Sequence, residues 1–186
     1  MRTLVLYYSQ TGKTKLVAEL LARRLNADLM RFTCPAFERG FVGGIRQAWA
    51  IFTRSTPEIS LPHEAEGPYE MVVLAGPVWA ARPAPPLRSA LTHRPSLGAR
   101  QALFLTCDGT STRFRATDAL AEAKSLGAHP PAATALFTAA DIAGPELSSL
   151  VETFADRVRA AMDAHRDVGE GARSDRSAQN PHLASA

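Results

Sequence analysis

The sequence predicts an α/β fold in which a five-stranded parallel sheet lies between two layers of helices, as a three-layer sandwich. The first observation behind this prediction is an alternation of short apolar runs, suited to buried strands, with segments whose apolar residues recur at helical spacing. The second is size and composition, because 186 residues with 46% hydrophobic and 21% charged residues suit one domain with a sizeable core.

The chain begins with a strand, a loop and a helix. An apolar run starts at Leu4 and passes into a turn rich in hydroxyl-bearing and small residues. Beyond the turn, apolar residues recur on one helical face: Leu16, Val17, Leu20, Leu21 and Leu25. Residues 28–32 then form a short strand, whose partly polar composition suits the edge of a sheet.

A second helix is predicted at about residues 42–54, where apolar side chains, Trp49 among them, recur at helical spacing. Core packing is the favoured interpretation of this apolar stripe. Two alternatives stay open: the stripe forms a wall of a substrate pocket or a partner surface, or the helix lies on an anionic membrane.

Three further apolar runs predict buried strands, with a helix after each. The strands are expected at residues 71–75, 102–106 and 134–138, and the helices at about residues 87–92, 114–126 and 147–162. Gly76 and Pro77 are expected to end the first of these strands. From His165 onward the chain lacks apolar periodicity, so we predict a domain at residues 1–164 and a disordered C-terminal tail at 165–186.

The loop from Ser9 to Thr14 has the chemistry of an anion site. The first turn of a helix leaves backbone N–H groups unpaired and carries a partial positive charge, so a phosphate group fits there. Gly12 lets the backbone approach closely, the hydroxyls of Ser9, Thr11 and Thr14 add donors, and the main chain from Gln10 onward can wrap the anion. An ordinary helix N-cap by Ser9 or Thr11 is the alternative interpretation.

Two other phosphate loops do not match this spacing. A nucleotide-triphosphate P-loop ends as Gly12, Lys13 and Thr14 do, but it requires another glycine five positions before Gly12, where Tyr7 stands. A dinucleotide fingerprint needs Gly-x-Gly-x-x-Gly after the first strand, and Gly12 is the single glycine there. Both of these loops are therefore excluded.

What remains is a hexapeptide of the form Ser-x-Thr-Gly-x-Thr, made by Ser9, Gln10, Thr11, Gly12, Lys13 and Thr14. It resembles the phosphate loop of the flavodoxin family, which holds the FMN phosphate without a metal. The resemblance extends over about residues 1–164. It implies a flavodoxin-like sheet of order 2-1-3-4-5, with FMN as the cofactor at the carboxyl ends of the strands.

Two later loops are expected at the same edge of the sheet, and the resemblance implies that they flank the isoalloxazine ring. The first contains Pro77, Val78, Trp79 and Ala80. In it, Trp79 would lie on or beside the ring; a merely packed loop residue is the alternative. The second loop would contact the pyrimidine side of the ring through Thr106, Cys107, Asp108 and Gly109.

No side chain is predicted to be catalytic, because the redox chemistry of a flavin belongs to the cofactor. Cys107 is interpreted as a small buried residue rather than a redox thiol, since the other cysteine, Cys34, is distant in sequence. Neither a disulfide framework nor a metal site is predicted, because the cysteines and the five histidines show no metal-ligand spacing.

Two features differ from the small electron-carrier flavodoxins that the chain resembles. Those proteins usually cover the outer face of the ring with an aromatic residue from the third loop, whereas residues 107–112 contain none and Phe114 is the nearest. They are also strongly acidic, whereas this chain has a formal net charge of +3. The basic charge, without a basic run or interleaved aromatic residues, does not indicate nucleic-acid binding.

The preferred hypothesis is an FMN-binding oxidoreductase that uses NAD(P)H to reduce quinones or other small planar acceptors. One alternative is an electron carrier for a redox protein. Another is a non-redox module that binds a phosphate-bearing ligand or partner. A cytoplasmic protein without stable membrane insertion is expected, because no apolar run approaches roughly 18 to 20 residues and the chain enters a strand directly. A homodimer stays open.

Overall fold

Five parallel strands form the sheet: β1 (Thr3–Tyr7), β2 (Asp28–Arg31), β3 (Met71–Trp79), β5 (Arg100–Cys107) and β6 (Thr134–Thr138). Their order is β2-β1-β3-β5-β6, and a short strand β4 (Arg82–Pro83) pairs antiparallel with the end of β3. The computed structural model describes residues 2–37, 50, 53, 55–93, 100–109, 115–127 and 129–178, with side chains through Ala164 except those of Glu64 and Glu66. With β4 set aside, the order is the predicted 2-1-3-4-5.

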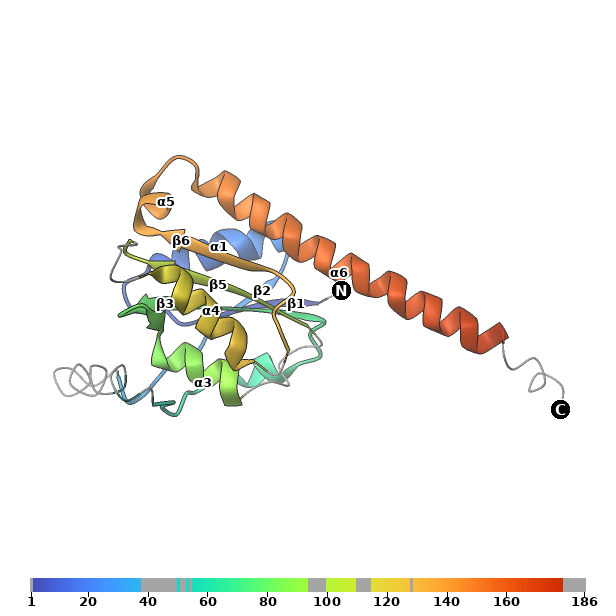
Figure 1. The fold of residues 1–186 in the computed structure, drawn as a ribbon, viewed down its shortest axis with the longest axis horizontal. Helices are drawn as coiled ribbons and strands as arrows, with labels where there is room; N and C mark the ends of the chain where they lie inside the picture. Colours follow the sequence, from blue (N-terminus) through green and yellow to red (C-terminus); the bar gives the residue numbers. More distant parts are fainter. Residues whose placement is uncertain are drawn as a thin grey trace.

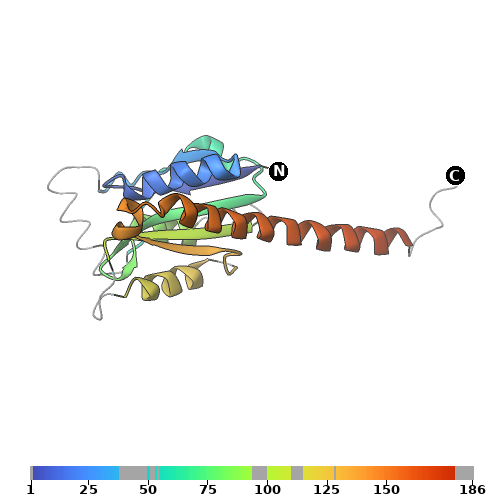
Figure 2. The ribbon, with the colours of Figure 1, turned by 90° about the horizontal axis from the view of Figure 1, so that it is seen from above.

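Helices cover both faces of the sheet (Figures 1 and 2). One layer contains α1 (Lys13–Leu25) and α6 (Leu147–Ala178), with the short α5 (Ala139–Ala143) before α6. The other layer contains α3 (Pro85–His93) and α4 (Ala116–Leu126), and a 3₁₀ turn, η1 (His63–Glu66), precedes β3. The predicted three-layer sandwich is therefore confirmed.

The two layers are separated by alternation along the strands. Leu4 and Leu6 of β1 pack with the α3 and α4 side of the core, whereas Val5 packs with the α1 and α6 side. All three are fully buried. Because β1 is covered on both faces, its sequence is a continuous apolar run rather than an alternating one.

Most of the predicted elements lie where the sequence places them. The strand at residues 134–138 is observed with the same bounds, and α4 ends at Leu126 before Gly127. The sequence did not predict α5, which begins after a capping box between Thr138 and Asp141. Of the helix predicted at residues 42–54, the structure describes Ala50 and Thr53, both helical, and the rest lies outside the described residues, as does Phe114.

The prediction that Gly76 and Pro77 end their strand is wrong. β3 continues through both residues to Trp79, with Gly76 opposite Leu105 and Pro77 opposite Thr106. The β1–β3 pairing ends at Ala75, so Pro77 lies beyond that ladder, where its missing N–H breaks no bond with β1. The carbonyl of Pro77 accepts a hydrogen bond from the N–H of Ala84, at 2.9 Å.

The backbone of α6 is helical as far as Ala178, which differs from the disorder predicted from residue 165. Figures 1 and 2 show this helix projecting beyond the sheet. Its side chains in the core include Phe154 and Val158, and Met162 packs against the core edge. Each residue added to an existing helix forms one backbone hydrogen bond, so a helix can extend beyond the part that packs on the core. The division into 1–164 and 165–186 stays a prediction.

Candidate functional site

The loop between β1 and α1 lies at the carboxyl edge of the sheet and presents backbone donors. Gly12 is the N-cap of α1, with a left-handed φ of 90°, and a Cβ built there meets no atom within 4 Å. The N–H groups of Lys13 and Thr14 belong to the first helical turn, where the helix itself supplies no acceptor. The loop thus combines open space over Gly12 with donors suited to an anion.

Ser9 supports this loop from within. Its hydroxyl accepts the N–H of Gly12 at 3.2 Å and the N–H of Lys15 at 3.3 Å, and the residue is only 7% exposed. The alternative of an N-cap by Ser9 or Thr11 therefore holds in part, because Gly12 occupies the cap position while Ser9 satisfies an N–H of the first turn. The remaining hydroxyl hydrogen of Ser9 can still be donated.

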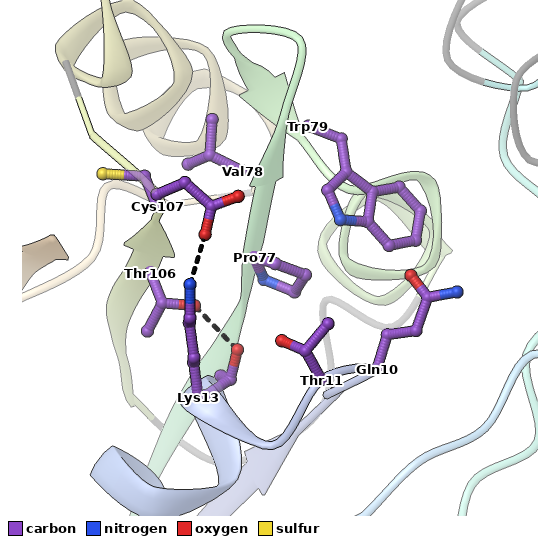
Figure 3. A pocket seen from close by; sticks show the side chains of 10 residues that line it. Gln10, Thr11, Lys13, Pro77, Val78, Trp79, Thr106 and Cys107 are labelled. Carbon is purple, nitrogen blue, oxygen red and sulfur yellow. Dashed lines mark hydrogen bonds and ion pairs between the residues drawn. The ribbon is translucent and has the colours of Figure 1, made fainter. Parts of the chain in front are cut away.

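A pocket opens beside this loop and is lined by residues from three segments of the chain (Figure 3). The segments follow β1, close β3 and end β5, so the pocket lies at the carboxyl ends of the central strands. The 10 lining residues were all predicted for the site: Gln10, Thr11, Lys13, Thr14, Pro77, Val78, Trp79, Thr106, Cys107 and Asp108.

Four other predicted site residues do not line this pocket: Ser9, Gly12, Ala80 and Gly109. Ser9 lies beneath the loop, and Gly12 supplies backbone, so neither presents a side chain to the space. Ala80 lies at the exposed turn after β3. The FMN contacts predicted for these four residues, and for the 10 that line the pocket, stay predictions.

Two threonines tie the anion loop to β5. The Oγ1 atoms of Thr14 and Thr106 are 2.7 Å apart, and both residues are 2% exposed. One hydroxyl donates to the other, so the bond fixes the start of α1 against the end of β5. A buried bond of this kind holds the pocket walls in register.

An ion pair lies beside these threonines, on the side of the pocket opposite Trp79 (Figure 3). Lys13 Nζ lies 2.5 Å from Asp108 Oδ1, and the dashed line from Lys13 in Figure 3 marks this contact. The side chains are 42% and 92% exposed, respectively. The pocket therefore contains one cation and one anion in contact, both accessible to solvent.

Aromatic residues hold Trp79 from one side. The ring of Tyr8 meets the indole at 5.9 Å with an interplanar angle of 79°, and the ring of Phe37 lies 6.2 Å away at 51°. Tyr8 and Phe37 are buried, whereas Trp79 is half-buried. Figure 3 shows the indole on the opposite side of the pocket from Lys13, with Pro77 between them. Sequence reasoning missed Tyr8 and Phe37, although Tyr8 directly precedes the anion loop.

The turn that follows Trp79 is strained. Ala80 and Ala81 have φ values of 48° and 60°, a left-handed region that disfavours residues with a Cβ. The pairing of Trp79 with Arg82 closes this turn into a hairpin. Arg82 also lies 3.6 Å from Glu122 of α4, which contacts Arg88 as well. Strand pairing and these ion pairs together hold the strained turn.

Cys107 lies at the end of β5 and is 6% exposed. Burial raises the pKa of its thiol above the usual value, so the thiol stays protonated at neutral pH. This environment agrees with a packed cysteine and gives no activated nucleophile. No group of three or more His, Cys, Asp or Glu side chains that could hold a metal ion occurs among the described residues.

No protein-family model matches the sequence, and no curated protein matches it. Solved structures do. A flavoprotein in complex with FMN from Lactobacillus acidophilus is 23% identical, with a TM-score of 0.57, and the match covers 80% of this chain and 97% of that one. A putative flavoprotein from Bacteroides eggerthii is 21% identical, with a TM-score of 0.56 and coverage of 88% and 96%. The chain has a flavodoxin-like fold.

A flavodoxin from Streptococcus pneumoniae extends this finding. It is 13% identical, with a TM-score of 0.51, and the match covers 86% of this chain and 99% of the flavodoxin. The predicted flavodoxin-like fold is thus confirmed over nearly the whole length of these proteins. No helix of the described residues is both long and apolar enough to cross a membrane.

Proposed function

We propose that this chain binds FMN in the pocket between Lys13 and Trp79 and uses it for electron transfer. The observation that carries the proposal is the meeting of the helix N-terminal loop and Trp79 in one pocket, at the carboxyl ends of β1, β3 and β5. In an open α/β sheet, this switch point is where ligands bind. The similar flavoprotein from Lactobacillus acidophilus is a complex with FMN, which supports the assignment.

The donor set suits the phosphate end of such a ligand. The N–H groups of Lys13 and Thr14 and the hydroxyl of Thr11 would bind phosphate oxygens, while Gly12 leaves open space above the loop. Ser9 would keep the loop in shape through the two N–H groups it accepts. These donors would bind the phosphate by hydrogen bonds, and the partial positive charge of the helix N-terminus would add to them.

The other pocket walls suit a flat ring. Trp79 would offer one indole face, since Tyr8 and Phe37 contact it elsewhere and fix its plane. Thr106, Cys107 and Asp108 would lie at the polar edge of the ring. Bound FMN can accept or give one or two electrons, and the protein's part is to bind it, orient it and exclude water.

Within this chemistry, we favour an oxidoreductase that takes electrons from NAD(P)H and passes them to a quinone or another small planar acceptor. The net charge of +3 supports this choice, because a carrier that docks on a basic redox protein is usually acidic. The part of the third loop that the structure describes, Cys107 to Gly109, also contributes no aromatic residue to cover a ring. An exposed ring face would admit a planar acceptor.

The absorbance spectrum of the purified protein, with and without added FMN, tests the proposal. We expect a bound flavin spectrum, and bleaching by NADPH followed by recovery with a quinone. Rapid reduction only by a reductase protein would instead select the electron-carrier alternative. A protein that neither contains nor takes up FMN would contradict the proposal and leave the non-redox module.

A further inference from the structure

We propose that the side chain of Lys13 is a ligand of the FMN phosphate. Without FMN it pairs with the Asp108 carboxylate, and FMN binding replaces that carboxylate with the phosphate. This inference rests on the proposed function, since it concerns the phosphate end of the same pocket. It assigns Asp108 a competing role, so removing its charge should strengthen FMN binding.

The geometry places Lys13 where it can serve either partner. Lys13 follows the N-cap residue Gly12 directly, so its backbone N–H lies in the anion loop while its ammonium group contacts Asp108. The ammonium group carries three donors on a flexible stem and can turn from one acceptor to another. Lys13 and Asp108 both line the pocket, so a ligand bound there would lie beside the ion pair.

The charges favour the exchange. Asp108 is 92% exposed and Lys13 is 42% exposed, and an ion pair so open to water contributes little to stability. A bound phosphate carries close to two negative charges and several acceptor oxygens, against one charge on the carboxylate. Asp108 would also repel a phosphate bound beside it. Breaking the Lys13–Asp108 pair therefore costs little free energy, and the pair of Lys13 with phosphate is the more favourable of the two.

Lys15 supplies a matched control. It lies two residues further along the same helix, with its Nζ 3.6 Å from Glu19 Oε1, and it does not line the pocket. Replacing Lys13 or Lys15 by methionine removes the same charge from the same helix. Only the change at Lys13 removes a group that can contact the phosphate.

The experiment measures dissociation constants for FMN and for riboflavin, which lacks the phosphate, by fluorescence titration. We expect Lys13→Met to weaken FMN binding about tenfold and to leave riboflavin binding unchanged. Asp108→Asn should strengthen FMN binding about threefold more than riboflavin binding, because riboflavin has no phosphate for the carboxylate to repel. In the double variant, Asp108→Asn should give a smaller gain, because the cation it releases is missing. Lys15→Met should bind both flavins as the parent does.

Salt dependence provides a second readout that does not need riboflavin. Raising NaCl from about 0.05 to about 0.5 M screens charge pairs. It should therefore weaken FMN binding more in the parent protein than in Lys13→Met. Equal salt dependence in the two proteins would contradict a phosphate contact by Lys13.

Other results would overturn the inference while the proposed function stands. These are unchanged FMN affinity in Lys13→Met, an equal loss for FMN and riboflavin in Lys13→Met, or weaker binding of FMN relative to riboflavin in Asp108→Asn. The last result would make Asp108 a supporting residue rather than a competitor. Failure of the parent protein to bind FMN at all would instead overturn the proposed function, and this inference with it.

Discussion

The two ends of the sheet use their polar groups differently. At the amino end, Arg2 pairs with Asp28 at 3.0 Å and stacks on Tyr69, whose hydroxyl donates to the same carboxylate. At the carboxyl end, Lys13 and Asp108 pair at one wall of an open pocket, beside the first-turn N–H groups of α1. The amino end joins its groups into one closed cluster, whereas the carboxyl end leaves donors facing a cavity.

Backbone strain shows the same contrast. At the amino end, the left-handed residue is Asn26, a type that tolerates this conformation, and its N–H bonds the carbonyls that end α1. At the carboxyl end, Ala80 and Ala81 adopt left-handed conformations without such tolerance, directly after Trp79. Strain that is not needed to end a helix is commonly kept near functional sites. The strained hairpin therefore adjoins the proposed flavin pocket, whereas the left-handed residue at the amino end closes a helix.

The largest expected effect is at the carboxyl end of the sheet, in the proposed flavin pocket. Trp79→Ala should weaken FMN binding about 10- to 100-fold, because a ring stacked on an indole loses a flat apolar partner. Flavin absorbance during titration measures it, and Trp79→Phe should retain most of the affinity. Unchanged affinity and an unchanged spectrum in Trp79→Ala would place the ring elsewhere.

The backbone of the anion loop gives the next effect. Gly12→Ala should lower the free energy of unfolding by about 1 kcal/mol, because φ there is 90°. Gly109→Ala is the matched control, since a Cβ at Gly109 also meets open space but its φ is not left-handed. Urea denaturation of both variants tests the strain. Equal stability in the two would show that the loop relaxes at no cost.

A smaller gain in stability is expected at the hairpin. Ala81→Gly should raise the free energy of unfolding by about 0.5 kcal/mol, because relief of a left-handed alanine exceeds the entropy cost of glycine. The same substitution at exposed Ala121 in α4 should instead lower it by about 1 kcal/mol, from lost helix propensity. Thermal unfolding distinguishes the two signs. A loss of stability at both positions would argue against strain in the turn.

The smallest effect concerns the amino end. Arg2 and Tyr69 hold the pKa of Asp28 below its usual value, so the contribution of this carboxylate to stability is present above the unfolded pKa. That contribution is lost as pH falls through the folded pKa. Because the pair is half-exposed, Asp28→Asn should lower the free energy of unfolding by less than about 0.5 kcal/mol at neutral pH. The difference from the parent should disappear in acid; a constant difference would contradict this account.

Sequence patterns predicted those features that local chemistry determines. The strand at residues 134–138 and the helix after Gly12 follow from apolar spacing and from a glycine at a tight turn. The pocket residues were found because parallel strands place their following loops at one edge. Gly76 and Pro77 were misread because the cost of proline in a strand depends on which neighbour it faces, and that is a property of the sheet.

Contacts between distant segments could not be predicted in the same way. Lys13 and Asp108 are far apart in the chain, as are Phe37 and Trp79, and no local pattern joins them. The turn at Ala80 and Ala81 lacks the Asn or Gly that would reveal a left-handed hairpin. Its conformation follows from the pairing of Trp79 with Arg82, which only the folded chain shows.

A crystal structure of the protein with FMN is the most direct test of the central claim, that the carboxyl end of the sheet is a flavin site. The account predicts the phosphate against the N–H groups of Lys13 and Thr14, and the isoalloxazine ring against the indole of Trp79. FMN bound at another surface, or a phosphate in the loop with the ring away from Trp79, would contradict it.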